Sequence, residues 1–177
     1  MLDGHPPSLR RALDWANRRA ILELDVKRGV SYEDVAREVR AANAMGRVIF
    51  ITYSVDGASP LARVASEAMI AALEGASDLD TLERRGVDLS HIIAWTGTDE
   101  PGSALNAALA ARGVEASFGT LAGWDRRFER EHADQYGAFA ETGLAMISTN
   151  RPEEAVRDLD ANDGVAGYAA MQCAGAH

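Results

Sequence analysis

Residues 20–27, Ala-Ile-Leu-Glu-Leu-Asp-Val-Lys, constrain the fold of this chain more than any other segment. Their side chains alternate strictly, so an extended strand would carry Glu23, Asp25 and Lys27 on one face and aliphatic side chains on the other. A half-exposed antiparallel strand has the same pattern. The following segments favour a parallel sheet instead, because a helical pattern and then the apolar run 48–51 come next, which is the order of a βαβ unit.

The charged face of this strand points to a functional site. In a parallel sheet covered by helices, such a face reaches solvent only where it lines the interior or the rim of a barrel. Two carboxylates and an amine placed there lose hydration, which is costly unless they pair or bind a cation. A structural ion pair at a barrel rim is the alternative interpretation.

Composition limits the classes of function. The 177 residues make one domain's worth of chain, and the net charge of −9 argues against a nucleic-acid partner because no basic stripe is present. A single Lys or Arg still suffices for a small phosphate-bearing ligand. Cys173 is the only cysteine, so an internal disulfide is impossible. No apolar run approaches the roughly 18 residues of a membrane helix, so we expect a protein that is not integral to a membrane. No leader pattern opens the chain, but any leader would belong to a missing N-terminal part, so the compartment, cytoplasm or periplasm, stays open.

Helical patterns alternate with short apolar runs and predict six βα units, an α/β fold. The predicted strands are residues 20–27, 47–52, 67–71, 91–95, 115–120 and 144–148. The predicted helices are residues 8–18, 31–44, 59–64, 78–85, 101–112, 133–142 and 152–160. Glycine follows a helix at Gly46, Gly86, Gly113 and Gly143, where a left-handed conformation would end it. We expect one domain over residues 1–160 and a flexible tail over 161–177.

The carboxyl ends of parallel strands hold the chemistry in barrels and in open α/β sheets. Asp25 would hold a hard divalent cation there through oxygen, and the ammonium of Lys27 would meet a phosphate oxygen. Trp95 and Phe118 would form an apolar wall for the organic part of a ligand, with ordinary core packing as the alternative. The helix start at Asn150 would offer its amides to an anion, with plain capping as the alternative.

Four segments in chain order resemble the glycerophosphodiester phosphodiesterase family, over about residues 6 to 160. Pro-Pro-Ser-Leu at 6–9 is similar to the family's Pro-Thr-Leu-Glu-Glu before its third barrel strand. Leu-Asp-Val-Lys at 24–27 is similar to that strand's Ile-Glu-Ile-Lys, and residues 48–54 resemble the fourth strand. Ser-Thr-Asn-Arg-Pro at 148–152 resembles the Thr-Asp-Arg-Pro that closes the eighth strand.

The resemblance implies a partial TIM-type β/α barrel with about six parallel βα units. It also implies a hydrolase that cleaves glycerophosphodiesters to glycerol 3-phosphate and an alcohol, in lipid metabolism, using calcium or magnesium and two histidines. Carried over by position, Asp25 would be a metal ligand, and Lys27 a catalytic residue that contacts the phosphate.

The chain also departs from the family pattern. Asp25 stands where Glu is commoner, and Asn150 where Asp is usual. The family's His-Arg-Gly motif, its first metal-binding acids and a later His-Asp have no counterpart here. We therefore expect a truncated chain that is inactive or weakly active alone, binds its cation weakly, and associates through exposed sheet edges. Two alternatives are a non-catalytic assembly module and a doubly wound domain that binds a phosphorylated ligand.

Overall fold

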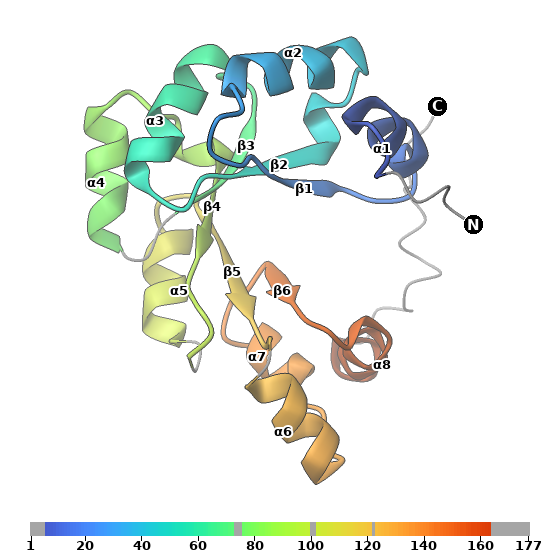
Figure 1. Cartoon of the computed structure of the whole chain (residues 1–177). Coiled ribbons are helices and arrows are strands. Elements are labelled where there is room, and N and C mark those ends of the chain that lie inside the picture. The colour runs from blue at the N-terminus through green and yellow to red at the C-terminus, as the bar shows by residue number, and fades with distance from the viewer. Residues whose placement is uncertain (1–5, 73–75, 100–101, 122, 164–177) are drawn as a thin grey trace. The chain divides into compact units, whose positions relative to one another are not determined.

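The computed structural model describes residues 6–72, 76–99, 102–121 and 123–163 (Figure 1). Within these ranges, six strands form one sheet in the order β1-β2-β3-β4-β5-β6. Their bounds are β1 Leu22–Asp25, β2 Val48–Ile51, β3 Met69–Ala72, β4 Ile92–Trp95, β5 Glu115–Gly119 and β6 Met146–Ser148.

The strand order confirms a partial TIM-type β/α barrel. The pairs β1–β2, β2–β3 and β5–β6 are parallel, with Asp25 opposite Ile51 in the first pair. Each strand neighbours the next one along the chain, as in a β/α barrel. The doubly wound alternative is wrong, because such a sheet reverses its strand order at a switch point.

At least one helix lies between every two successive strands along the described chain. The helices are α1 Leu9–Ala16, α2 Tyr32–Ala41, α3 Val55–Val64, α4 Ala76–Arg84, α5 Ser103–Ala110, α6 Trp124–Glu131, α7 Tyr136–Ala140 and α8 Pro152–Asp163, with short 3₁₀ turns η1 Met45–Arg47 and η2 Leu89–His91. The sequence patterns locate every strand and seven of these helices, but not α6. The predicted start at Pro101 lies outside the described residues, and α5 begins at Ser103.

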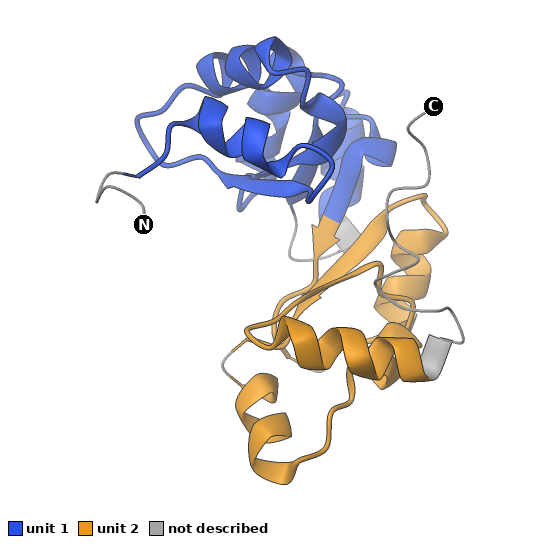
Figure 2. Ribbon diagram, turned by 90° about the vertical axis from the view of Figure 1, so that its right-hand side faces the viewer, with its two compact units in different colours: residues 1–73, 77–93 blue, residues 74–76, 94–177 orange. Residues whose placement is uncertain are grey.

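The chain divides into two compact units (Figure 2). Unit 1 comprises residues 1–73 and 77–93, and unit 2 comprises residues 74–76 and 94–177. Unit 1 contains α1 to α4, and Figure 1 shows α2 and α3 on the same side of β1 and β2. Its fully buried side chains include Leu13, Val39, Phe50, Leu61 and Ile70.

A serine side chain caps the N-terminus of each of the first three helices of unit 1. Ser31 Oγ accepts a hydrogen bond from the Asp34 backbone N–H at 3.4 Å and so caps α2. Ser54 caps α3 in the same way through the Gly57 N–H at 3.1 Å. The α3 helix therefore starts four residues before the predicted position. Gly57 permits this start, because a Cβ there would lie 2.6 Å from the Thr52 carbonyl oxygen.

The core of unit 2 is aromatic. Phe118, Phe128, Tyr136 and Phe139 form a buried cluster with Ala155 of α8. The rings of Phe118 and Phe139 meet edge to face with centroids 5.4 Å apart. Phe128 belongs to α6, so the helix that the sequence patterns missed supplies a central core residue.

The glycine signals are correct at three helix ends out of four. Gly86, Gly113 and Gly143 have φ of 77°, 72° and 89°. Gly46 does not end α2, because Asn43 adopts the left-handed conformation instead, with φ of 50°. The last helix continues to Asp163, past the predicted end at Asp160, and the rest of the predicted tail, residues 164–177, lies outside the described residues. No helix in the described ranges has both the length and the apolar character needed to cross a bilayer.

Candidate functional site

The ion pair between Asp25 and Lys27 forms the centre of the candidate site in unit 1. Asp25 is the last residue of β1, and Lys27 Nζ donates to Asp25 Oδ2 two residues later. The Asp25 side chain is 30% exposed and that of Lys27 is 75% exposed. The carboxylate is thus held at the strand end while most of the amine remains open to solvent.

The second carboxylate oxygen of Asp25 lacks a partner. Oδ1 is buried and accepts no hydrogen bond from any described residue. A buried polar atom without a partner is costly, and such atoms in native structures normally meet a water, an ion or a ligand. Asp25 Oδ1 is therefore the free acceptor of this site.

Tyr53 joins the pair from the end of β2. Its backbone has φ of 55°, in the left-handed region that an aromatic residue rarely occupies. The residue is 70% exposed, and its phenol lies beside the Asp25 carboxylate. Strain of this kind persists where the surrounding structure enforces it, often at functional sites. Tyr53 directly follows the predicted strand 47–52, but nothing in the sequence signals its backbone conformation.

The electrostatics of the site favour the charged forms of both partners. The hydrogen bond from Lys27, followed by the neighbouring Tyr53 phenol, lowers the pKa of Asp25 below its usual value. The same carboxylate raises the pKa of Lys27, and it raises the pKa of Tyr53. Burial and the Asp25 charge raise the pKa of Tyr32, in the first turn of α2. At neutral pH the site thus combines a carboxylate, an ammonium and neutral phenols.

The fit of a divalent cation to these residues is incomplete. Calcium prefers six to eight oxygen ligands, and magnesium an octahedral set. No group of three or more His, Cys, Asp or Glu residues that could hold a metal occurs within the described ranges. Asp25 Oδ1 provides one acceptor of the right chemistry, and the described residues do not complete a site around it.

The two aromatic candidates lie in unit 2. Trp95 ends β4 and is half-buried, and its indole lies across the backbone of Gly119, where a Cβ would come within 2.5 Å of Trp95 Cη2. Phe118 is fully buried in the aromatic core. Trp95 therefore keeps some exposed surface, whereas Phe118 has none.

A second polar cluster in unit 2 centres on Asp125, in the first turn of α6. The sequence patterns missed it together with that helix. The segment 149–152, which we expected to bind an anion or cap a helix, meets this carboxylate: Thr149 Oγ1 and the Asn150 N–H donate to it at 2.8 and 2.7 Å. Arg151 next to them pairs with Asp134 at 2.6 Å. In these contacts, groups of the segment that could have bound an anion bond to Asp125 and Asp134.

Comparison with known proteins supports the fold. No family model matches the sequence, and no curated protein matches it. A glycerophosphoryl diester phosphodiesterase structure from Parabacteroides distasonis matches with a TM-score of 0.74 and 23% identity, over 88% of this chain and 55% of that one. A second one from the same organism has a TM-score of 0.53 and 16% identity, over 89% and 65%. A Galdieria sulphuraria protein named for the same activity has a TM-score of 0.63 and 11% identity, over 89% and 65%.

These similarities confirm the resemblance at the level of fold. At such identities a shared fold does not by itself carry an activity. The chain spans less than two thirds of the length of each of these structures.

Proposed function

We propose that this chain is a relative of the glycerophosphodiester phosphodiesterases and that the end of β1 binds the phosphate of a small phosphodiester. The observation that carries the proposal is the Asp25–Lys27 pair at a strand's carboxyl end, in a fold shared with solved enzymes of that name. The pair stands where the barrel fold gathers its chemistry, and neither partner is saturated.

Lys27 has the chemistry of a phosphate contact. An ammonium group has three N–H donors, and among the described residues Lys27 Nζ donates a hydrogen bond to Asp25. Its exposed tip can donate to a phosphoryl oxygen through a charge-assisted hydrogen bond. During hydrolysis it would stabilise the negative charge that develops on the phosphoryl group.

Asp25 would supply one oxygen, Oδ1, to a calcium or magnesium ion. Such a cation polarises a phosphoryl oxygen when it is bound. Because the described residues offer no group of three or more acidic, His or Cys ligands around Asp25, we propose weak cation binding and slow or absent hydrolysis by this chain alone. The reaction proposed for the complete site yields glycerol 3-phosphate and an alcohol.

Within unit 2, Trp95 is the aromatic residue that we propose for contact with an apolar part of a ligand, since its indole is partly exposed at the end of β4. Phe118 is not proposed for this role, because its ring is fully buried.

Binding and turnover together test the proposal. Glycerol 3-phosphate is titrated into the purified chain while amide resonances are followed by NMR, and hydrolysis of glycerophosphodiesters is assayed with and without calcium or magnesium. Lys27→Gln should weaken binding by about tenfold, as loss of a charge-assisted contact predicts. Unchanged affinity in this variant contradicts the proposed phosphate contact, and rapid turnover by the unmodified chain contradicts the proposed low activity.

Arg63→Gln is the matched control. Arg63 is exposed in the last turn of α3, and its substitution removes the same charge from the same unit as Lys27→Gln does. The helix of ten residues places it roughly 15 Å along its axis from the Ser54 cap. This variant should leave the affinity for glycerol 3-phosphate unchanged.

A second candidate function is assembly through the sheet. The strand order leaves β1 and β6 at the two ends of the described sheet. An unpaired strand edge exposes backbone donors and acceptors to other chains. We propose that a second copy pairs there, and sedimentation should then give a mass above that of one chain. A monomer at all concentrations contradicts this candidate.

A further inference from the structure

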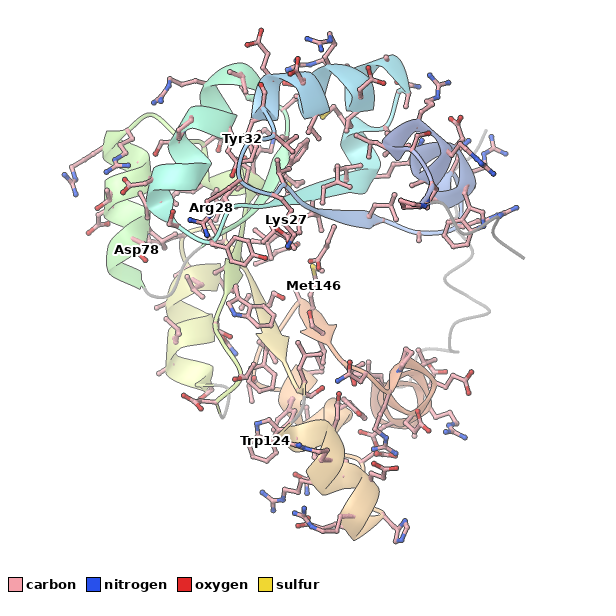
Figure 3. The ribbon with its side chains drawn as sticks, viewed as in Figure 1. Lys27, Arg28, Tyr32, Asp78, Trp124 and Met146 are labelled. Atoms are coloured by element: carbon pink, nitrogen blue, oxygen red, sulfur yellow. The ribbon has the colours of Figure 1, made fainter. Side chains whose placement is uncertain are left out.

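Lys27 and Arg28 lie in a tight turn at the end of β1 (Figure 3). The Val30 N–H donates to the Lys27 carbonyl at 3.1 Å, and Gly29 at the third position has φ of 90°. A hydrogen-bonded turn with glycine at this position fixes the backbone that carries the two cations. Both side chains therefore project from a short, ordered segment next to the Asp25 carboxylate.

Arg28 is exposed and, within the described ranges, forms no ion pair or side-chain hydrogen bond. Some other arginines of unit 1 are paired, among them Arg37 with Asp34, Arg40 with Glu67 and Arg85 with Asp56. Asp25 balances one of the two adjacent cations, Lys27. The turn thus keeps one net positive charge in a chain whose net charge is −9.

The two cations suit different anionic groups. Lys27 is a point charge, already oriented by Asp25, that fits a single phosphoryl oxygen. Arg28 carries a planar fork that binds a carboxylate or a phosphate through two parallel hydrogen bonds. Their Cα atoms are about 3.8 Å apart, as in any trans peptide, so two long side chains can meet two groups of one small molecule.

We infer that Arg28 is a second anion contact of this site, and that the site favours a phosphodiester whose alcohol part carries a further negative charge. This inference rests on the proposed function, because Lys27 must hold the phosphodiester for Arg28 to reach the second group. It assigns a specificity-determining residue and a substrate class that the fold leaves open. A diester whose alcohol carries a quaternary ammonium should bind least well, since that group would face Arg28.

Two probes that differ by one phosphodiester test the inference. Glycerophosphoglycerol has one charged group, and 1,3-bis(glycerophospho)glycerol has two on the same glycerol chemistry. Both are titrated into the full chain by NMR at one low ionic strength, since surface electrostatics are screened by salt. The unmodified chain should bind the doubly charged probe about tenfold more tightly, beyond the factor of about two expected from its two equivalent groups.

The variants separate the two claims. Arg28→Gln should reduce the preference to about twofold, because it weakens binding of the doubly charged probe far more than binding of the singly charged one. Lys27→Gln should weaken both probes, and Arg63→Gln should change neither. If Lys27→Gln has no effect, the proposed function fails. If Lys27→Gln acts but Arg28→Gln keeps the preference, or if the unmodified chain shows no preference, the inference alone is overturned.

Discussion

Thr120 Oγ1, just after β5, donates a hydrogen bond of 2.6 Å to Oδ1 of Asp125 in the first turn of α6. Three further donors reach the same carboxylate: the Tyr136 hydroxyl at 3.1 Å, the Thr149 hydroxyl at 2.8 Å and the Asn150 N–H at 2.7 Å. Asp125 is 3% exposed, so these bonds replace its hydration. The carboxylate thereby connects the end of β5, the helix α7 and the segment after β6.

Asp125→Asn should destabilise the fold. The amide offers one acceptor oxygen in place of two, and its NH2 group would face either the hydroxyls or the Asn150 N–H. We expect the free energy of unfolding, measured by urea denaturation, to fall by about 2–4 kcal/mol, as for a buried charged network that loses a partner. Asp99→Asn is the control, since Asp99 is exposed, and its effect should stay within about 0.5 kcal/mol. Equal effects of both variants contradict the role of Asp125.

The same residue should make stability depend on acid pH. Burial alone would raise the pKa of Asp125, but the hydrogen bonds from Thr120, Asn150, Thr149 and Tyr136 outweigh it and leave the pKa below its ordinary value of 3.8. The unfolded chain then binds a proton at a pH where the folded chain does not. The contribution of Asp125 is complete above the unfolded pKa and is lost as pH falls through the folded one.

Urea denaturation at a series of pH values below about 5 measures this loss, because the unfolded carboxylate titrates near 3.9. The free energy of unfolding should fall less steeply with decreasing pH in Asp125→Asn than in the unmodified chain. Asp99→Asn should keep the original slope. A slope unchanged by Asp125→Asn would show that other carboxylates account for the acid sensitivity.

The sequence predicts the strands of this fold well for a simple physical reason. Strands buried in a parallel sheet need short apolar runs, and each run here is separated from the next by a helical pattern, as around Val48–Ile51. The alternation of residues 20–27 also places Asp25 and Lys27 together, which the ion pair confirms. These features are local, so local patterns reveal them.

The features that the sequence does not reveal depend on tertiary contacts. The α6 helix, Trp124–Glu131, is so rich in charged residues that its buried positions Asp125 and Phe128 form no continuous apolar stripe. The Asp125 carboxylate can be identified as the centre of a hydrogen-bond network only from the fold, which brings Thr149 and Tyr136 beside it. The left-handed backbone of Tyr53 is equally invisible, because aromatic residues do not normally signal it.

Gly119→Ala should disturb the packing of Trp95. A Cβ at this position would lie 2.5 Å from Trp95 Cη2 and 3.2 Å from Thr98 Cγ2, well inside contact distance. The indole must move, and we expect a loss of about 1–3 kcal/mol in the free energy of unfolding, as for other overpacked sites. Near-ultraviolet circular dichroism should report the displaced indole.

Two further variants control this prediction. Gly46→Ala places its Cβ in open space and should change stability by less than about 0.5 kcal/mol. Adding Gly119→Ala to Trp95→Ala should cost much less than adding it to the unmodified chain, since the clashing ring is gone. Additive effects of Gly119 and Trp95 substitutions would mean that the ring is not what excludes a Cβ.

Replacing Tyr53 should raise the stability of the chain in one variant while weakening ligand binding. Asn tolerates a φ of 55° better than Tyr does, so Tyr53→Asn should raise the urea midpoint, whereas Tyr53→Phe keeps the strain and should not raise it. Both variants remove the phenol beside Asp25 and should weaken binding of glycerol 3-phosphate. His132→Asn is the control, because His132 also has a positive φ, 50°, and is not among the residues assigned to the site, so it should raise the midpoint without affecting binding. If the urea midpoint of Tyr53→Asn is lower than that of Tyr53→Phe, the backbone is not strained at this position. The aromatic ring itself then stabilises the strand end.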